Sequence, residues 1–159
     1  MKLLTIITLE ASIAFAPAAV IAAIIFTSAK AADAPIAPTQ DISDKYIQKG
    51  GALMYSEFQM RGELEKSCQV YADLERFYPE KYNRLTRICP GFIEEGTKAA
   101  HILLYGMLGA LATSQEFAEE GNRNAACLSY AHYQFYSIDY LEIEPESKAA
   151  RKPPAIKCF

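Results

Sequence analysis

The chain has 159 residues, enough to bury one hydrophobic core, so we expect a single folded domain. Its 16 lysines and arginines are outnumbered by 19 aspartates and glutamates, which gives a formal net charge of −3. This balance argues against a nucleic-acid-binding protein, because such a protein needs a basic face to displace counterions. The basic residues at 148–157 stand among prolines after an acidic run, a composition typical of a solvated tail.

The N-terminus has the pattern of an export signal. An apolar run occupies 11–26, and the Ala-Lys-Ala sequence at 29–31 fits the small-x-small rule for cleavage before Ala32. Glu10 interrupts the apolar stretch, and the run after it approaches the ~18 to 20 residues that span a bilayer, so an uncleaved anchor is the alternative. We expect residues 1–31 to be a signal peptide or an inner-membrane anchor. Either one places the remainder in the periplasm or another extracytoplasmic compartment.

The folded domain is expected to follow a short linker. Residues 32–42, which include two prolines, predict an extended linker, and the domain is expected to cover 43–159. From 43 to 77, apolar residues recur at intervals of three and four among charged ones, which predicts a helix. We expect Gly50 and Gly51 to kink or split this helix, because glycine weakens a helix interior.

Two prolines mark the expected starts of the next helices, because proline is tolerated in a first helical turn. Pro79 predicts a short helix that runs to Ile88, and Pro90 predicts a longer one. The longer helix is expected to be the central one, since nearly every residue at 102–112 is apolar while the run is too short to cross a membrane. Its glycines, which would let neighbouring helices approach closely, are Gly96, Gly106 and Gly109.

The following residues carry the signals of two more helices. The tetrapeptide at 113–116 has the spacing of a capping box and Gly121 suits a helix C-terminus, so a short helix is predicted at 114–120. Asn122 or Asn124 is expected to cap a last long helix at 124–143. No segment alternates with a period of two, so we expect no sheet.

The four cysteines form an even set, which in an oxidising compartment predicts two disulfides. The spacing allows three pairings. We favour Cys68–Cys89, which would join two helices, and Cys127–Cys158, which would tie the tail to the last helix. Each would stabilise the fold by about 3 to 4 kcal/mol. The expected fold is all-α, a small bundle of four to five helices stabilised by two disulfides and preceded by an N-terminal hydrophobic export segment.

Three of the cysteines are followed by an aromatic residue three positions later. The pairs are Cys68 with Tyr71, Cys89 with Phe92 and Cys127 with Tyr130. Positions i and i+3 share a helix face, so we expect each ring to cover the sulfur as a packing device. A metal or haem site is not expected, because no Cys-x-x-Cys spacing occurs and the two histidines, His101 and His132, stand apart. We expect no cofactor.

Two pairs of adjacent acidic residues are the candidates for catalytic chemistry. Two carboxylates can divide acid and base duties, and the candidates are Glu94-Glu95 and Glu119-Glu120. Adjacent helical residues point about 100° apart, however, so ordinary surface acids are the favoured interpretation. No nucleophile motif or phosphate-binding glycine loop is found. We expect a protein that is not an enzyme, with an enzyme using Glu94 or Glu95 as the least favoured hypothesis.

A tyrosine stripe is the unusual feature of the last helix. Its members recur at three- and four-residue spacing and are Tyr130, Tyr133, Tyr136 and Tyr140. Tyrosine is enriched at interfaces, so the stripe is our candidate interaction face. The alternative is that these side chains form core, because amphipathic periodicity mainly reports burial.

Two short stretches carry a family resemblance. The segment Cys89-Pro-Gly-Phe-Ile-Glu-Glu-Gly96-Thr-Lys-Ala99 resembles the Rap/Tai type of periplasmic immunity proteins, which often read Cys-x-Gly-aromatic-aliphatic-x-Gly before a helix. The segment at 140–146, followed by Cys158, is similar to their C-terminal part. Gly96 falls one residue late, and no loop follows Cys127 as in that pattern. The resemblance implies a small helical disulfide-bearing domain that neutralises a type VI secretion effector by blocking its active site with a surface loop.

These observations predict an exported, non-catalytic protein–protein interaction domain of the bacterial envelope, with an immunity-type inhibitor as its specific form. The expected partner is another protein, either an effector or a subunit of an envelope complex. No nucleic acid is expected, and a membrane would be contacted only through residues 1–31 if they stay uncleaved. The alternative is a membrane-anchored accessory or structural subunit of a larger envelope complex.

Overall fold

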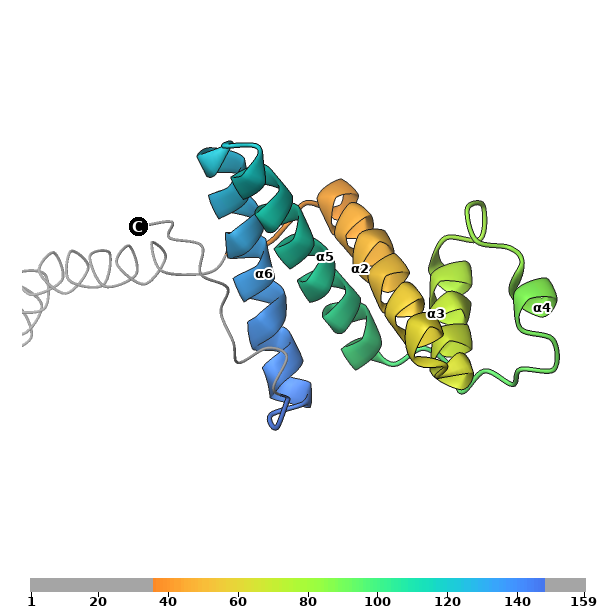
Figure 1. Cartoon of the computed structure of the whole chain (residues 1–159). Coiled ribbons are helices and arrows are strands. Elements are labelled where there is room, and N and C mark those ends of the chain that lie inside the picture. Colours follow the sequence, from red (N-terminus) through yellow and green to blue (C-terminus); the bar gives the residue numbers. More distant parts are fainter. Residues whose placement is uncertain (1–35, 148–159) are drawn as a thin grey trace, which may run out of the picture. The chain divides into compact units, whose positions relative to one another are not determined.

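The computed structural model describes residues 36–147. They form five α-helices, which are α2 (Gln40–Arg61), α3 (Leu64–Phe77), α4 (Leu85–Ile88), α5 (Ala99–Glu119) and α6 (Arg123–Ile143), and none of these residues lies in a strand (Figure 1). The all-α prediction with four to five helices is confirmed for this part of the chain. The expected export segment at 1–31 and Cys158 lie outside the described residues. Helix α2 begins at Gln40, before the predicted domain start at 43.

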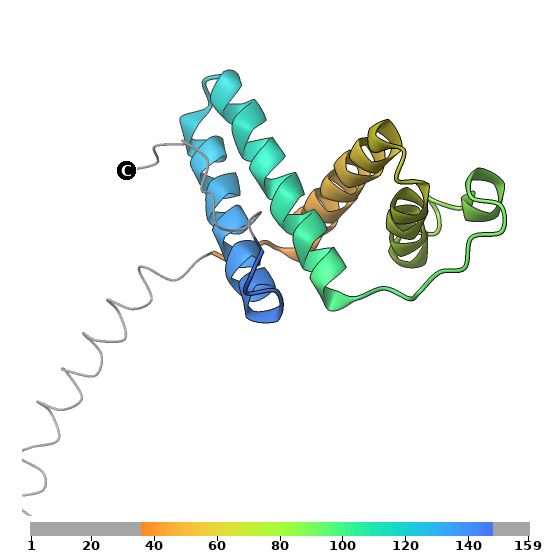
Figure 2. The ribbon, with the colours of Figure 1, turned by 60° about the horizontal axis from the view of Figure 1, so that its bottom comes forward.

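Helix α5 lies between α6 and α2, and α3 packs against α2 (Figures 1 and 2). The short α4 contacts α3 and is carried on the segment that connects α3 to α5. Helix α5 is the central helix that the sequence predicted, because Met107 and Ala110 have no exposed surface. The loop after α4 therefore leads directly into the central helix.

The core consists of two groups of buried side chains. The first lies among α2, α5 and α6 and comprises Tyr46, Met107, Ala110, Tyr130, Tyr133 and Tyr136. The second joins α2, α3 and α5 and comprises Ile47, Val70, Leu74 and Tyr105. Every buried side-chain nitrogen and oxygen of the described residues has a hydrogen-bond partner. Two members of the second group, Val70 and Tyr105, also line an open groove at this side of the bundle.

The predicted split at Gly50 and Gly51 is wrong, because α2 runs through both glycines. A Cβ at Gly50 would lie 1.8 Å from the carbonyl oxygen of Tyr105, and a Cβ at Gly109 would lie 1.9 Å from that of Tyr46. The two glycines therefore let the backbones of α2 and α5 touch, and tertiary packing outweighs the weak helix propensity of glycine. Helix α2 ends instead at Gly62, whose φ of 72° no other residue adopts easily.

Both predicted helix starts at proline are wrong. Residues 79–84 form a turn and irregular structure, and only Leu85–Ile88 is helical before Cys89. Residues 90–98 are an irregular loop, and α5 begins at Ala99. Gly91 and Gly96 have φ values of 78° and 85°, which a helix cannot contain, so the loop cannot join α5.

The predicted short helix at 114–120 is also wrong, because α5 continues without interruption to Glu119. Thr113 does not act as a cap, since its hydroxyl donates a hydrogen bond of 2.8 Å to the carbonyl of Gly109 within the same helix. The predicted end at Gly121 is confirmed by its φ of 75°. Asn122 caps α6 as predicted, accepting a hydrogen bond of 3.2 Å from the amide of Ala125.

Candidate functional site

The structure places the predicted tyrosine stripe mainly inside the bundle. Tyr130, Tyr133 and Tyr136 are buried, and Tyr140 is half-buried against the same core group. The rings of Tyr130 and Tyr133 stack at 5.5 Å, and the hydroxyl of Tyr136 lies 2.6 Å from Ser43 Oγ on α2. This burial favours the core interpretation over an interaction face.

Of the predicted disulfides, Cys68–Cys89 is formed, with a Cα–Cα distance of 5.9 Å. Its two cysteines are buried and join α3 to the residue that ends α4. Cys127 is not a free thiol, and its predicted partner Cys158 lies outside the described residues. The pairing Cys127–Cys158 stays a prediction.

The helical spacing that was expected to place an aromatic ring over each sulfur is absent at Cys89. Cys89 follows α4 and precedes an irregular loop, so helical i, i+3 geometry does not apply to Phe92. On α3, the ring of Tyr71 packs against the rings of Tyr55 and Tyr82, at centroid distances of 5.9 and 5.8 Å. These aromatic residues therefore have packing partners of their own.

An open groove with a volume of about 1010 Å³ lies beside the disulfide. One wall comes from α2 and α3 and includes Phe58 and Leu64. The other, the loop wall, comes from the end of α4 and the loop after it and includes Ile88 and Ile93. His101 and Tyr105 of α5 and the disulfide itself also line it. Ile93 is 87% exposed, and Leu64 and Ile88 are exposed as well. An apolar surface of this kind, rimmed by charged residues, is typical of an interaction site.

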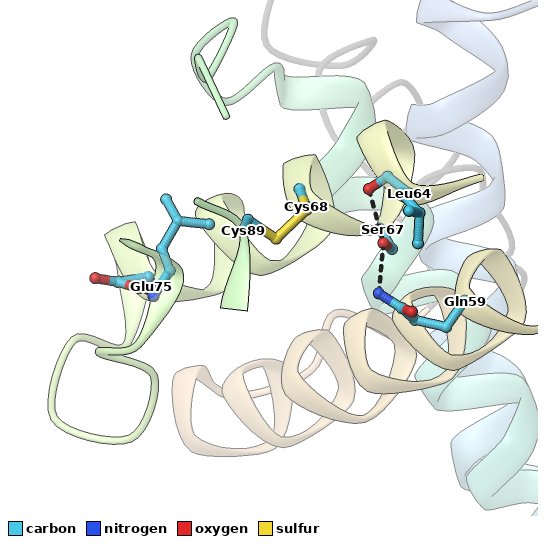
Figure 3. The surroundings of a disulfide bond; sticks show 7 residues. Gln59, Leu64, Ser67, Cys68, Glu75 and Cys89 are labelled. Atoms are coloured by element: carbon cyan, nitrogen blue, oxygen red, sulfur yellow. Dashed lines mark hydrogen bonds between the residues drawn. A yellow bond between two sulfur atoms is a disulfide. The ribbon is translucent and has the colours of Figure 1, made fainter. Parts of the chain in front are cut away.

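The corner between α2 and α3 is fixed by a buried serine next to the disulfide (Figure 3). Ser67 donates a hydrogen bond of 2.8 Å to the carbonyl of Leu64 and accepts one of 2.8 Å from Gln59 Nε2. Figure 3 shows this pair of hydrogen bonds beside Cys68 and its bond to Cys89. The wall of the groove formed by α2 and α3 is therefore held in place.

The loop wall is held by Gln69 in addition to the disulfide. Gln69 Oε1 accepts a hydrogen bond of 3.1 Å from the amide of Glu95, and Gln69 Nε2 donates one of 3.4 Å to the carbonyl of Gly96. An ion pair between Arg76 and Glu94, at 3.9 Å, adds a weaker tie. Residues 89–96 are thus fixed to α3 at both ends.

The polar centre of this region is Asp73 of α3, which is only 1% exposed. Its Oδ1 accepts a hydrogen bond of 3.0 Å from Gln69 Nε2. Its Oδ2 lies 2.7 Å from the hydroxyl of Tyr105, which donates to it, and 3.0 Å from His101 Nδ1. Burial and the neighbouring Asp73 carboxylate raise the pKa of Tyr105, so this hydroxyl keeps its proton. The carboxylate links α3 to α5 and, through Gln69, to the loop.

Sequence reasoning missed Asp73. The available signal was its place between Val70 and Leu74, both buried core positions, because a charge there must find partners. His101 was noted only as a lone residue beside an apolar run, whereas its side chain is 29% exposed and lines the groove.

An aspartate–histidine pair can orient a general base, but the groove offers no partner for nucleophilic catalysis. The described residues that line it include no serine or threonine, and both of its cysteines are disulfide-bonded. Of the paired acids, Glu94 forms an ion pair with Arg76 and Glu95 one with Lys98, at 3.6 Å, and both are surface pairs.

The second histidine lies in the other core group. His132 is buried, and its Nδ1 lies 3.0 Å from the hydroxyl of Tyr46, which in turn lies 3.1 Å from Ser129 Oγ. Burial lowers the pKa of His132. Between residues 36 and 147, no three metal-ligating side chains gather in one place.

No family model, no curated protein and no solved structure matches this chain. None of the described helices combines the length and the apolar character needed to cross a bilayer.

Proposed function

We propose that this chain is an exported, non-catalytic protein–protein interaction domain of the bacterial envelope, which binds its partner through the groove and the loop at 89–98. The observation that carries the proposal is Ile93, which is 87% exposed on a loop tied down by a disulfide and by Gln69. A folded chain gains nothing by itself from holding a large apolar side chain in water. A partner that covers Ile93 removes its apolar surface from water, which favours binding.

The fixed conformation of the loop supports this proposal. Ordering a flexible segment on binding costs free energy, so a loop already held in place binds its partner more tightly for the same contacts. The disulfide and the hydrogen bonds of Gln69 restrict the loop before the partner arrives. An immunity-type inhibitor, which presents such a loop to the active site of a toxic enzyme, is the specific form we favour, in keeping with the resemblance at 89–99.

The second candidate is a membrane-anchored accessory subunit of a larger envelope complex. It is favoured by the apolar run at 11–26, whose length approaches that of a bilayer span. The intact mass of protein recovered from a native envelope fraction separates the two candidates. A mass that begins at Ala32 supports the released domain, and a full-length mass supports the anchored subunit.

The same measurement tests the second disulfide that we propose, Cys127–Cys158. Reduction should add the mass of two hydrogens for each disulfide, so a gain of four hydrogens supports the pair. A gain of two would mean that Cys68–Cys89 is the only disulfide of the mature chain.

The test of the binding surface is a photo-crosslinking experiment in intact envelopes. A photoreactive phenylalanine analogue replaces Ile93, and the matched control carries it at Gln134, an exposed position on α6 outside the groove. We expect a defined higher-mass protein adduct from position 93 and none from position 134. Equal adducts from both positions, or none from position 93, would contradict the proposal.

A further inference from the structure

We propose that the groove takes a short segment of the partner in which apolar side chains stand next to a lysine or an arginine. This inference rests on the interaction function proposed above and adds the chemistry of the partner. It follows from two features of the groove, its apolar walls and an exposed carboxylate at its edge.

The apolar part of the partner segment is set by the walls. Phe58 and Leu64 stand on the helical wall, and Ile88, Phe92 and Ile93 stand on the loop wall. Because the two walls belong to separate elements and leave a groove between them, side chains that enter from the partner can contact both. Burial of apolar surface from both sides is the main favourable term in such a contact.

The charges at the groove are unequal. Three charged side chains other than histidine line it, namely Glu65, Lys66 and Glu95. Lys66 is already engaged, because it forms an ion pair with Glu63 and its Nζ lies 5.5 Å from the centre of the Phe58 ring. Glu65 is exposed and forms no ion pair with any described residue. An unpaired carboxylate at the edge of an apolar groove attracts a cationic side chain.

His101 and Asp73 form a second polar group at the groove. His101 Nδ1 lies 3.0 Å from the Asp73 carboxylate, so the positive charge of a protonated imidazole is balanced by its own carboxylate partner. The hydroxyl of Tyr105 is committed to Asp73. With the unpaired carboxylate of Glu65, the side chains of the groove carry a net negative charge, and their complement is a donor with positive charge.

The experiment uses a phage-displayed library of random twelve-residue peptides, selected on the purified, oxidised full-length chain. We expect enriched peptides to place a lysine or arginine within four positions of a large aliphatic or aromatic residue. An enriched set that is acidic, or that is apolar without a cation, overturns the inference, and so does the absence of any enrichment.

Charge variants then place the selected peptide in the groove. A synthetic peptide of the enriched sequence should bind Glu65→Lys at least tenfold more weakly than the parent, and Glu65→Gln severalfold more weakly. The matched control is Glu119→Lys, which makes the same charge change at the exposed end of α5 and should leave binding unchanged. Thermal unfolding of all three variants checks that the fold is intact. Equal loss with Glu65→Lys and Glu119→Lys would show a non-specific charge effect and would refute the assignment.

The peptide selection and the crosslinking experiment can fail independently of each other. A protein adduct from position 93 together with peptides that lack a cation leaves the interaction function standing and removes this inference. If neither an adduct nor an enriched peptide is found, both are lost.

Discussion

Asp73 is a buried carboxylate whose two oxygens both accept hydrogen bonds. It accepts hydrogen bonds from Gln69, His101 and Tyr105, so three donors from α3 and α5 depend on one side chain. Burying a carboxylate costs free energy, and its hydrogen bonds offset that cost only while every partner is present. A substitution of Asp73 should therefore weaken the packing of α5 against α3 and the attachment of the loop.

We predict that Asp73→Asn lowers the free energy of unfolding by about 1 to 3 kcal/mol, because the amide nitrogen meets donors where the carboxylate accepted them. Urea titration measures the change. Asp139→Asn on the partly exposed side of α6 is the matched control and should shift stability by less than about 0.5 kcal/mol. Equal effects in the two variants would mean that the hydrogen bonds to Asp73 contribute little.

His132 makes the stability of the fold depend on pH. Burial lowers its pKa in the folded state, so below its unfolded pKa of about 6.5 the unfolded chain binds more protons than the folded one. Tyr46, which faces His132, and Ser129, which is hydrogen-bonded to the Tyr46 hydroxyl, are uncharged at this pH and offer the imidazolium no counter-ion. The contribution of His132 is therefore present above pH 6.5 and is lost as the pH falls below that value.

We predict that His132→Asn removes this component. Chemical denaturation at pH 7.5, 6.0 and 5.0 should show the parent losing more stability than the variant between the first and last values, by up to about 1.4 kcal/mol per pH unit. All other ionisable groups are common to both proteins, so their contributions cancel in the difference. Parallel pH profiles would contradict the prediction.

At the level of helices, α2 and α5 cross closely because a glycine of each faces the backbone of the other. A Cβ at Gly50 or at Gly109 would force the two helices apart and open the core between them. Close-packed interiors accommodate extra atoms poorly. The crossing is therefore the part of the bundle least tolerant of added volume.

We predict that Gly50→Ala destabilises the fold by at least about 2 kcal/mol, although alanine is the better helix former by about 1 kcal/mol. Gly51→Ala is the matched control, since its Cβ would meet the Leu74 side chain at 2.7 Å, and a side chain can shift where backbone cannot. Its cost should be smaller. Thermal unfolding compares the two variants, and the opposite order would show that the helices separate readily.

The helices could be predicted from sequence where periodicity and caps agree, as at Asn122 and Gly121. Prediction failed where a local signal competed with packing between distant residues. The glycine pair at 50–51 indicates a break unless the partner backbone of α5 is known, and Pro90 indicates a helix start unless the neighbouring glycine conformations are known. The disulfide Cys68–Cys89 could be predicted, but the groove beside it could not, because its walls come from segments whose approach no local pattern encodes.

For the molecule as a whole, the disulfide couples stability to binding. Cys68 and Cys89 are 21 residues apart in the sequence, and closing a loop of this size stabilises a fold by about 3 kcal/mol in the chain-entropy model. The same bond holds the wall of the groove that carries Ile93. Loss of the disulfide should therefore weaken binding of the partner by loosening the loop, in addition to destabilising the fold.

We predict two separable effects of replacing Cys68 and Cys89 together by alanine. The free energy of unfolding should fall by about 3 kcal/mol in a urea titration, and amides at 90–98 should exchange hydrogen faster while those of α6 keep their protection. Binding of the selected peptide should weaken even at a temperature at which the variant is fully folded, because the loop must then be ordered on binding. Gln69 would still tie the loop at Glu95 and Gly96, so some protection should persist there. If the folded variant binds like the parent, Gln69 alone is sufficient to shape the groove, and the disulfide serves stability only.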